Sequence, residues 1–339
     1  MNGANLVCSA CLILCSVWAQ AAADDKEWLM LLEKTDGAYQ KGQYLAACDF
    51  AQQALRAART FPHNDIRRAV TLRHIGTLSG TLGRYAEAEA AYVEAIHILE
   101  GNVGQRYQLA QVQHDLARVY MQFGARYAQA EKLMERVLAL GIEVVGPDHP
   151  DVAGMLANLA SARMMLRKDL QAQALLDRAL TVLENSPPQY QTEKASILAN
   201  LGFLSFWRGD ATEALSYMER SVTLNETALG PNDPELITGL LNLARLRLEL
   251  HDVGAAEAPV RQALLIAERS LGPDHPVLYQ VLSTYALILR KSGRKADALP
   301  LERRAKAVLA ANPDQAANLT VHVTGLFDRG KGRGKRLVE

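Results

Sequence analysis

The hexapeptide Leu-Gly-Pro-Asp-His-Pro at residues 271–276 returns as Leu-Gly-Pro-Asn-Asp-Pro at 229–234 and as Val-Gly-Pro-Asp-His-Pro at 145–150. Its glycines stand at positions 146, 230 and 272, which are 84 and 42 residues apart. Glycine suits the position just after a helix, where φ is positive, and the next proline prevents the helix from continuing. The second proline suits the first turn of a new helix, where its missing N–H costs no hydrogen bond. The hexapeptide therefore predicts a helix end followed at once by a helix start.

Two further landmarks keep the same spacing along the chain. Alanines recur after 41 residues and then five times after 42, at Ala47, Ala88, Ala130, Ala172, Ala214, Ala256 and Ala298. Small residues that follow an apolar residue recur in step, at Gly76, Ala117, Ala160, Gly202, Ala244 and Ala286. Three landmarks in one register indicate seven repeats, the first of them degenerate. They lie near residues 26–60, 66–101, 107–146, 151–186, 191–230, 235–272 and 277–312.

Each repeat is predicted to form two helices. In the fifth repeat, residues 193–208 carry apolar side chains close to a 3.6-residue period, Gly209 and Asp210 interrupt it, and residues 211–229 continue it. Gly202 and Ala214 are small enough to let the two helices approach each other. Neither helix can bury its apolar stripe alone, so the hairpins must stack. The predicted fold is an all-α superhelix, a solenoid of about seven hairpins over residues 24–312.

These features resemble the tetratricopeptide repeat (TPR) family, in the 42-residue form of kinesin light chains. The match rests on the hexapeptide, on Ala-Asn-Leu-Ala at 157–160, Ala-Asn-Leu-Gly at 199–202 and Leu-Asn-Leu-Ala at 241–244, and on Gly-Arg-Tyr-Ala-Glu-Ala-Glu at 83–89. It covers roughly residues 36–313. The first repeat lacks the hexapeptide, and the turn at 124–127 is one residue longer than its counterparts. The resemblance implies the fold far more specifically than a function, because these repeats serve many partners.

The resemblance also implies a ligand groove along the first helices. In related repeats an Asn before the Leu-small pair hydrogen-bonds the backbone of a bound peptide, and an amide group both donates and accepts. The corresponding positions here, called the ladder positions below, are His74, Asp115, Asn158, Asn200, Asn242 and Thr284. The alternative is that these side chains brace neighbouring helices within the solenoid.

Residues one helical turn from the ladder positions share their face. They are basic or polar in the N-terminal half, at Arg73, Gln111, His114 and Arg118, and more apolar in the C-terminal half, at Phe203, Phe206, Trp207, Leu241, Arg245 and Leu287. We therefore expect a groove with a basic end and an apolar end, suited to a peptide that carries acidic residues beside a bulky anchor. The alternative is that some of these residues fill the interior.

Composition excludes several classes of protein. The chain has 339 residues, 49% of them hydrophobic, with 37 basic and 37 acidic side chains. Zero net charge argues against a nucleic acid partner, because coating nucleic acid requires a basic excess. The 6% of aromatic residues favours helix over strand. The last eleven residues hold five basic groups and one acidic group, so the rest of the chain carries a charge of −4.

The first 23 residues are predicted to be a signal peptide. They contain no charged residue, their apolar core is too short to span a membrane, and small residues suit cleavage near Ala21 or Ala23. The absence of Lys or Arg near the start leaves an uncleaved anchor or a misassigned start as alternatives. Cleavage would remove three of the four cysteines and leave Cys48, so no internal disulfide is expected. The expected location is periplasmic or secreted.

No catalytic, metal or cofactor site is expected. His149 and His275 lie three repeats apart and cannot share a metal ion in a rigid array, and the zinc motifs are absent. The segment at 325–332 resembles a phosphate-binding loop but ends in Gly332, where a magnesium-binding Ser or Thr is needed. Residues 318–327 alternate weakly and allow a short strand. The basic tail that follows is expected to be solvated, with weak contact to an anionic surface as the alternative.

The sequence thus favours an exported, non-catalytic scaffold that binds a peptide or protein partner. The alternative is a helical docking subunit of a larger envelope or secretion assembly, and an enzyme is the least favoured reading.

Overall fold

The computed structural model describes residues 25–312, except for 42, 103, 123–125 and 185. Every regular element in this part of the chain is a helix, which confirms the predicted all-α fold. The predicted signal peptide, the possible strand at 318–327, the basic tail and residues 124–125 of the long turn lie outside the described residues. By its contacts the chain divides into two compact units, Met1–Leu140 and Gly141–Glu339. The two units are therefore described separately.

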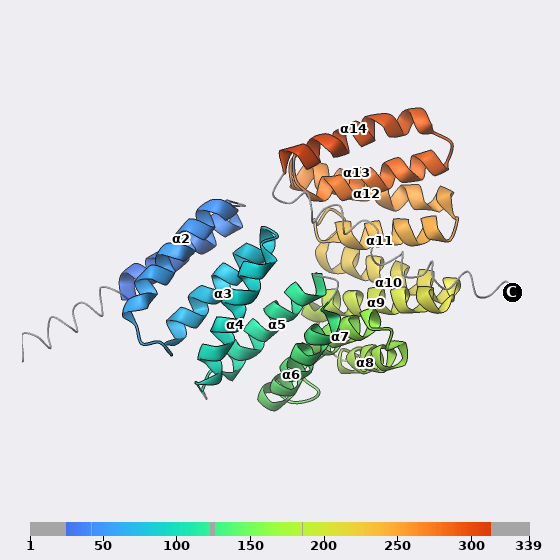
Figure 1. Ribbon diagram of the computed structural model, residues 1–339. Helices are drawn as coiled ribbons and strands as arrows, with labels where there is room; N and C mark the ends of the chain where they lie inside the picture. The colour runs from blue at the N-terminus through green and yellow to red at the C-terminus, as the bar shows by residue number, and fades with distance from the viewer. Residues whose placement is uncertain (1–24, 42, 103, 123–125, 185, 313–339) are drawn as a thin grey trace, which may run out of the picture. The chain divides into compact units, whose positions relative to one another are not determined.

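The helices follow one another without other structure between them (Figure 1). The first unit contains a helix at residues 25–40, then α2 (Tyr44–Ala57), η1 (Ala58–Thr60), α3 (Ile66–Thr81), α4 (Tyr85–Glu100), α5 (Arg106–Gln122) and most of α6 (Tyr127–Val145). The second contains α7 (Pro150–Met165), α8 (Asp169–Val182), η2 (Pro188–Tyr190), α9 (Gln191–Arg208), α10 (Ala211–Leu229), α11 (Leu236–Glu249), α12 (Val253–Ser270), α13 (Val277–Lys291) and α14 (Lys295–Ala311).

The 42-residue register is visible in the helix starts. The second helices of six consecutive hairpins, α4 to α14, begin at residues 85, 127, 169, 211, 253 and 295, each 42 after the last. Within the second unit, α7 packs on α8, α9 on α10, α11 on α12 and α13 on α14, and α10 and α12 also pack on the hairpin that follows. Each apolar stripe is thus completed by a neighbouring hairpin, as stacking requires.

The hexapeptide joints form as predicted. Gly146, Gly230 and Gly272 have φ of +91°, +89° and +84°, which an L-residue rarely adopts. After the glycine, His149 Nδ1 accepts a hydrogen bond from the Asp151 N–H at 3.2 Å. His275 Nδ1 likewise accepts from the Val277 N–H at 3.3 Å. Both histidines therefore help to satisfy the free N–H groups at a helix start.

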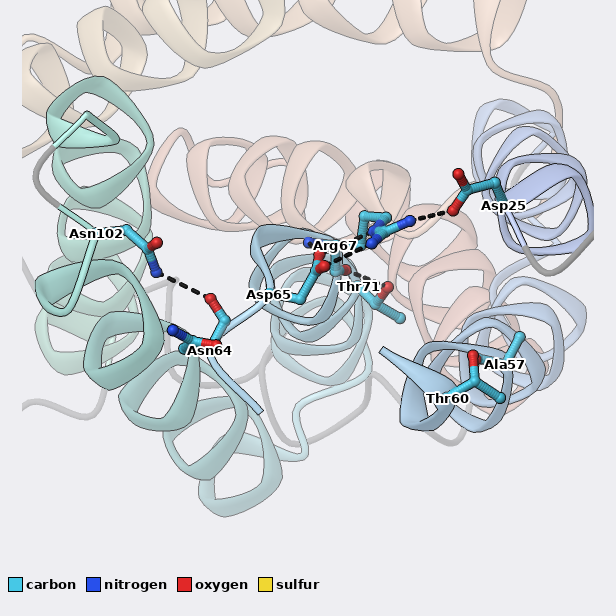
Figure 2. A network of polar contacts seen from close by, with 8 residues as sticks. All are labelled: Asp25, Ala57, Thr60, Asn64, Asp65, Arg67, Thr71 and Asn102. Atoms are coloured by element: carbon cyan, nitrogen blue, oxygen red, sulfur yellow. Dashed lines mark hydrogen bonds and ion pairs between the residues drawn. The ribbon is translucent and has the colours of Figure 1, made fainter. Parts of the chain in front are cut away.

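The first repeat replaces the hexapeptide with a different polar joint, drawn in Figure 2. Asp65 Oδ1 accepts from the Arg67 N–H at 2.9 Å and begins α3. The Arg67 guanidinium also pairs with Asp65 and Asp25, which ties α3 to the helix at 25–40. Asn102, after α4, donates to the Asn64 carbonyl at 2.9 Å. This polar network thus joins the helices at a position where the hexapeptide is absent.

Small residues line the crossing inside each hairpin. All seven landmark alanines, from Ala47 to Ala298, are 0% exposed. A Cβ built on Gly202 would lie 3.2 Å from the Ala214 carbonyl oxygen, so these two residues make the predicted close contact. A Cβ on Gly76 would lie 2.7 Å from the ring of Tyr92, which is itself 3% exposed. At Gly76 and Gly202 the crossing therefore leaves too little room for an added methyl group without a shift of the neighbouring atoms.

We expect Gly76→Ala to destabilise the protein and Gly154→Ala to stabilise it. The first methyl group would overlap the Tyr92 ring, and overpacking costs about 1–3 kcal/mol. Gly154 lies inside α7 with nothing within 4 Å of a built Cβ, so alanine gains about 1 kcal/mol of helix propensity. Urea unfolding of both variants measures the difference. Shifts of the same sign would contradict the packing argument.

A second prediction concerns acid sensitivity at the joint that contains His275. Burial lowers the pKa of His275, so the folded state holds this proton less tightly than the unfolded state. Its contribution to stability is present above the ordinary pKa of about 6.5 and is lost as the pH falls through that value toward the folded pKa. Asparagine caps a helix without titrating. The unfolding midpoint of His275→Asn should therefore fall less between about pH 7 and 5 than that of the wild type, and parallel pH profiles would refute this role.

Candidate functional site

Four of the predicted groove residues meet in the first unit, on the first helices α3 and α5. Arg73 Nε donates to Asp115 Oδ2 at 2.7 Å, and its NH1 group donates to Gln111 Oε1 at 2.7 Å. His74 Nε2 lies 3.2 Å from Asp36 Oδ1, on the helix at 25–40. These contacts link three neighbouring first helices through their side chains.

Two adjoining cavities open between these side chains. One, of about 230 Å³, is lined by Thr35, Asp36, Tyr39, Arg73, His74, Thr77 and Leu78. The other, of about 120 Å³, is lined by Tyr39, Thr77, Gly80, Thr81, Tyr92, Asp115, Arg118 and Val119. They share Tyr39 and Thr77, so together they form one hollow, called the first-unit hollow below. The predicted residues Arg73, His74, Asp115 and Arg118 all line it.

Most charges around the first-unit hollow are already neutralised. Burial tends to raise the pKa of Asp115, but hydrogen bonds from His114 and Arg73 hold that pKa below its ordinary value. Burial raises the pKa of Tyr92 to about 12, and its hydroxyl lies 3.0 Å from Thr77 Oγ1. Arg118 is exposed and, among the described residues, makes no hydrogen bond or ion pair. Its guanidinium is the cation left for an incoming anion.

Sequence reasoning missed Asp36 and Tyr39. Both lie on the helix at 25–40, whose repeat lacks the hexapeptide. Asp36 stands 41 residues before Thr77, the same interval that separates the first two landmark alanines. Extending the register into this degenerate repeat would therefore have placed Asp36 beside the hollow.

At four ladder positions the side chains contact a neighbouring first helix, beginning with the His74–Asp36 contact described above. Asp115 accepts from Arg73 of the preceding repeat. Asn200 Nδ2 donates to Ser161 Oγ at 3.2 Å, and Thr284 Oγ1 accepts from Arg245 Nε at 3.2 Å. Asn158 and Asn242 are partly buried at the equivalent positions of α7 and α11. The hydrogen bonds between neighbouring helices, which were the alternative expected from the sequence, thus engage these side chains. Their contact with a peptide stays a prediction.

The aromatic residues expected at the apolar end lie inside the second unit. Phe203 and Trp207, both on α9, are 4% and 5% exposed, and their ring centroids are 6.3 Å apart. Leu241 is 3% exposed, whereas Leu287 on α13 is 45% exposed. The burial of Phe203 and Trp207 gives them a packing role, and a direct contact of either ring with a ligand stays a prediction.

Arg245 on α11 is partly buried, and its guanidinium hydrogen-bonds only the hydroxyl of Thr284 among the described residues. Burial lowers the pKa of Arg245. A guanidinium in a low-dielectric site is stabilised by a carboxylate or phosphate far better than by a neutral hydroxyl. Arg245 therefore resembles Arg118 in lacking an anion.

A larger open hollow of about 970 Å³ follows α10 in the second unit. Its lining mixes leucines with hydroxyl and charged side chains, including Leu198, Leu215, Ser216, Arg220, Thr223 and Leu250. Sequence reasoning missed it because the search for a groove considered the first helices.

The described residues hold no group of three His, Cys, Asp or Glu side chains placed to bind a metal ion. No helix in this part of the chain is long and apolar enough to cross a membrane. Cys48, partly buried, is a free thiol.

Comparison with known proteins identifies the repeat. The family model described as Tetratricopeptide repeat matches residues 108–185 and 193–264. No curated protein matches the sequence at a significant level.

Solved structures share the fold at low sequence identity. BtubC (BKLC) from P. vanneervenii is 24% identical, with a TM-score of 0.50, over 72% of this chain and 94% of that chain. Aspartyl phosphate phosphatase F from Bacillus subtilis is 13% identical, with a TM-score of 0.61, over 88% of this chain and 74% of that one. The Rap conjugation gene regulator of the plasmid pLS20, solved in complex with the Phr* peptide, is 14% identical, with a TM-score of 0.54. The match covers 88% of this chain and 76% of that chain. The family model thus assigns residues 108–185 and 193–264 of this chain to the tetratricopeptide repeat family, and the solved structures share the fold of the chain.

Proposed function

We propose that this protein is an exported scaffold whose first helices bind a peptide or protein segment without catalysing a reaction. The TPR fold supports an adaptor that works through protein interactions. A protein with the same fold, the pLS20 Rap regulator, has been solved with a bound peptide. That likeness extends to the fold alone, so the argument for binding rests on this chain's own side chains.

The observation that carries the proposal is the presence of two guanidinium groups without an anionic partner among the described residues. Arg118 borders the first-unit hollow, and Arg245 sits partly buried on α11. They occupy equivalent positions, each three residues after a ladder position. A buried cation is normally paired, so the partly buried Arg245 without an anion is the stronger indication of an anionic ligand, and Arg118 adds an exposed guanidinium beside the first-unit hollow.

The chemistry of the first-unit hollow suits an extended segment with an acidic side chain. Arg118 supplies a charged donor for a carboxylate. Tyr39, 39% exposed, supplies a ring against which an apolar neighbour of that carboxylate packs. The expected ligand is therefore a peptide in which acidic and bulky residues lie close together.

Charge reversal tests the binding site. We expect Arg118→Glu and Arg245→Glu each to weaken binding of a partner recovered by proteome-wide pull-down with the full chain by at least about tenfold, which is about 1.4 kcal/mol. Arg178→Glu is the matched control, because Arg178 is an exposed arginine on the second helix α8 with no ion pair in the described structure. Isothermal titration measures affinity, and thermal unfolding checks that each variant is folded. Unchanged affinity in both Arg118→Glu and Arg245→Glu would contradict the proposed binding groove.

The same pull-down separates this proposal from its alternatives. Short linear segments as the recovered partners support the scaffold. Stable stoichiometric subunits would instead indicate a docking component of a larger envelope or secretion assembly. A hydrolase or transferase activity that persists after all partners are removed would indicate an enzyme.

Export is the part of the proposal that rests on the first 23 residues. We expect the full chain to reach the periplasm or the medium, shortened near Ala21 or Ala23, because an uncharged apolar leader ends there in small residues. A chain without residues 1–23 should stay in the cytosol. Fractionation followed by N-terminal sequencing measures both, and cytosolic retention of the full chain would refute export.

A further inference from the structure

The charge of the protein is strongly segregated along the chain. Residues 277–312, which form the last hairpin, contain seven Lys or Arg and two Asp or Glu, a net charge of +5. The two preceding hairpins, at 191–230 and 235–272, carry −2 and −1. Residues 313–339 add +2, so residues 1–276 carry −7. The neutral total therefore conceals a strongly basic end.

The two acidic groups of this hairpin are already engaged. Glu302 binds Arg290, with NH2 and Oε2 2.8 Å apart. Asp297 binds Arg294, which also pairs with Glu257 on α12. Glu268 on α12 binds Arg304. The four remaining cations are exposed and have no ion pair among the described residues, namely Lys291, Lys295, Arg303 and Lys306.

Three of these free cations share one face of α14. Lys295, Leu299, Arg303 and Lys306 are spaced by four, four and three residues, which places them along one side of a helix over about 17 Å. Leu299, in the middle of this row, is 51% exposed. Ala298, Ala305 and Val308 form the opposite side and are at most 4% exposed. Figure 1 shows α14 as the last helix of the second unit, beyond α13. We call the exposed row the α14 basic face.

We propose that the α14 basic face docks onto an anionic phospholipid surface. A bilayer neutralises a row of cations without a matching pocket, and anionic headgroups attract each Lys or Arg that comes close. An exposed leucine between the cations adds contact with the boundary between headgroups and acyl chains. An acidic protein is a poorer fit, because lysine is depleted from protein interfaces and this row offers no buried anchor for a hot spot. The proposal is independent of the peptide groove.

Vesicle binding by the full chain tests this docking surface. The probes are vesicles of phosphatidylcholine and phosphatidylglycerol in a ratio of about three to one, and vesicles of phosphatidylcholine alone. Wild-type protein should sediment with the anionic vesicles only, and binding should fall sharply between about 0.1 M and 1 M salt as the screening length shrinks. The triple variant Lys295→Gln/Arg303→Gln/Lys306→Gln should bind at least about tenfold more weakly.

The matched control is Lys132→Gln/Arg136→Gln/Arg178→Gln, which removes the same charge from exposed, unpaired positions on α6 and α8. It should lose much less binding than the triple variant, and thermal unfolding should show both proteins folded. Equal losses in the two variants, or no binding of wild type to anionic vesicles, would overturn the proposal. So would binding of poly-glutamate in place of vesicles, which would assign the surface to an acidic polypeptide. Peptide binding at Arg118 should be unchanged in the triple variant, so failure here leaves the groove untouched.

Discussion

The close crossing of two helices inside each hairpin is the constraint on which the rest of the structure depends. At every repeat an alanine on the second helix is fully buried, and in the fifth repeat Gly202 faces the carbonyl of Ala214 with no room to spare. A longer side chain at such a crossing would separate the helices and expose both apolar stripes. Because the crossing recurs every 42 residues, it also fixes which positions on successive first helices become neighbours.

That register turns a row of equivalent positions into a row of contacts. Arg73 reaches Asp115, Asn200 reaches Ser161, and Arg245 reaches Thr284, each 39 to 42 residues away and on the adjacent first helix. Such bonds satisfy polar groups that packing would otherwise leave buried and unpaired. They also decide what is left for a ligand, because a side chain that braces a helix is no longer free. The cations on the first helices that these contacts leave without an anionic partner are therefore the candidates for ligand binding.

The fold was predictable from the sequence because its causes are local and periodic. Glycine with positive φ, proline at a helix start and a buried alanine every 42 residues each act within a few residues of themselves. The site was only partly predictable, because a helical period identifies a face without identifying what covers it. Phe203 and Trp207 share a face with Asn200, yet packing within the second unit buries both rings. Asp36 and Tyr39 were missed because the ladder positions were followed only from the second repeat onward.

Arg245 and the α14 basic face present unpaired cations in different settings, and these settings indicate different ligands. Arg245 is single and partly buried, so an anion bound to it would be screened by salt less than an anion at the surface. Such a site favours a ligand with one defined acidic group. The α14 basic face is a row of exposed, flexible side chains, each weakly attractive and fully screened by salt. Such a row binds appreciably only when many anions contact it at once, and it does not require them at a fixed spacing. A lipid surface provides such an array of anions. A chain of zero net charge can therefore hold separate cationic sites for anions, because the acidic groups nearest to them are already engaged in ion pairs.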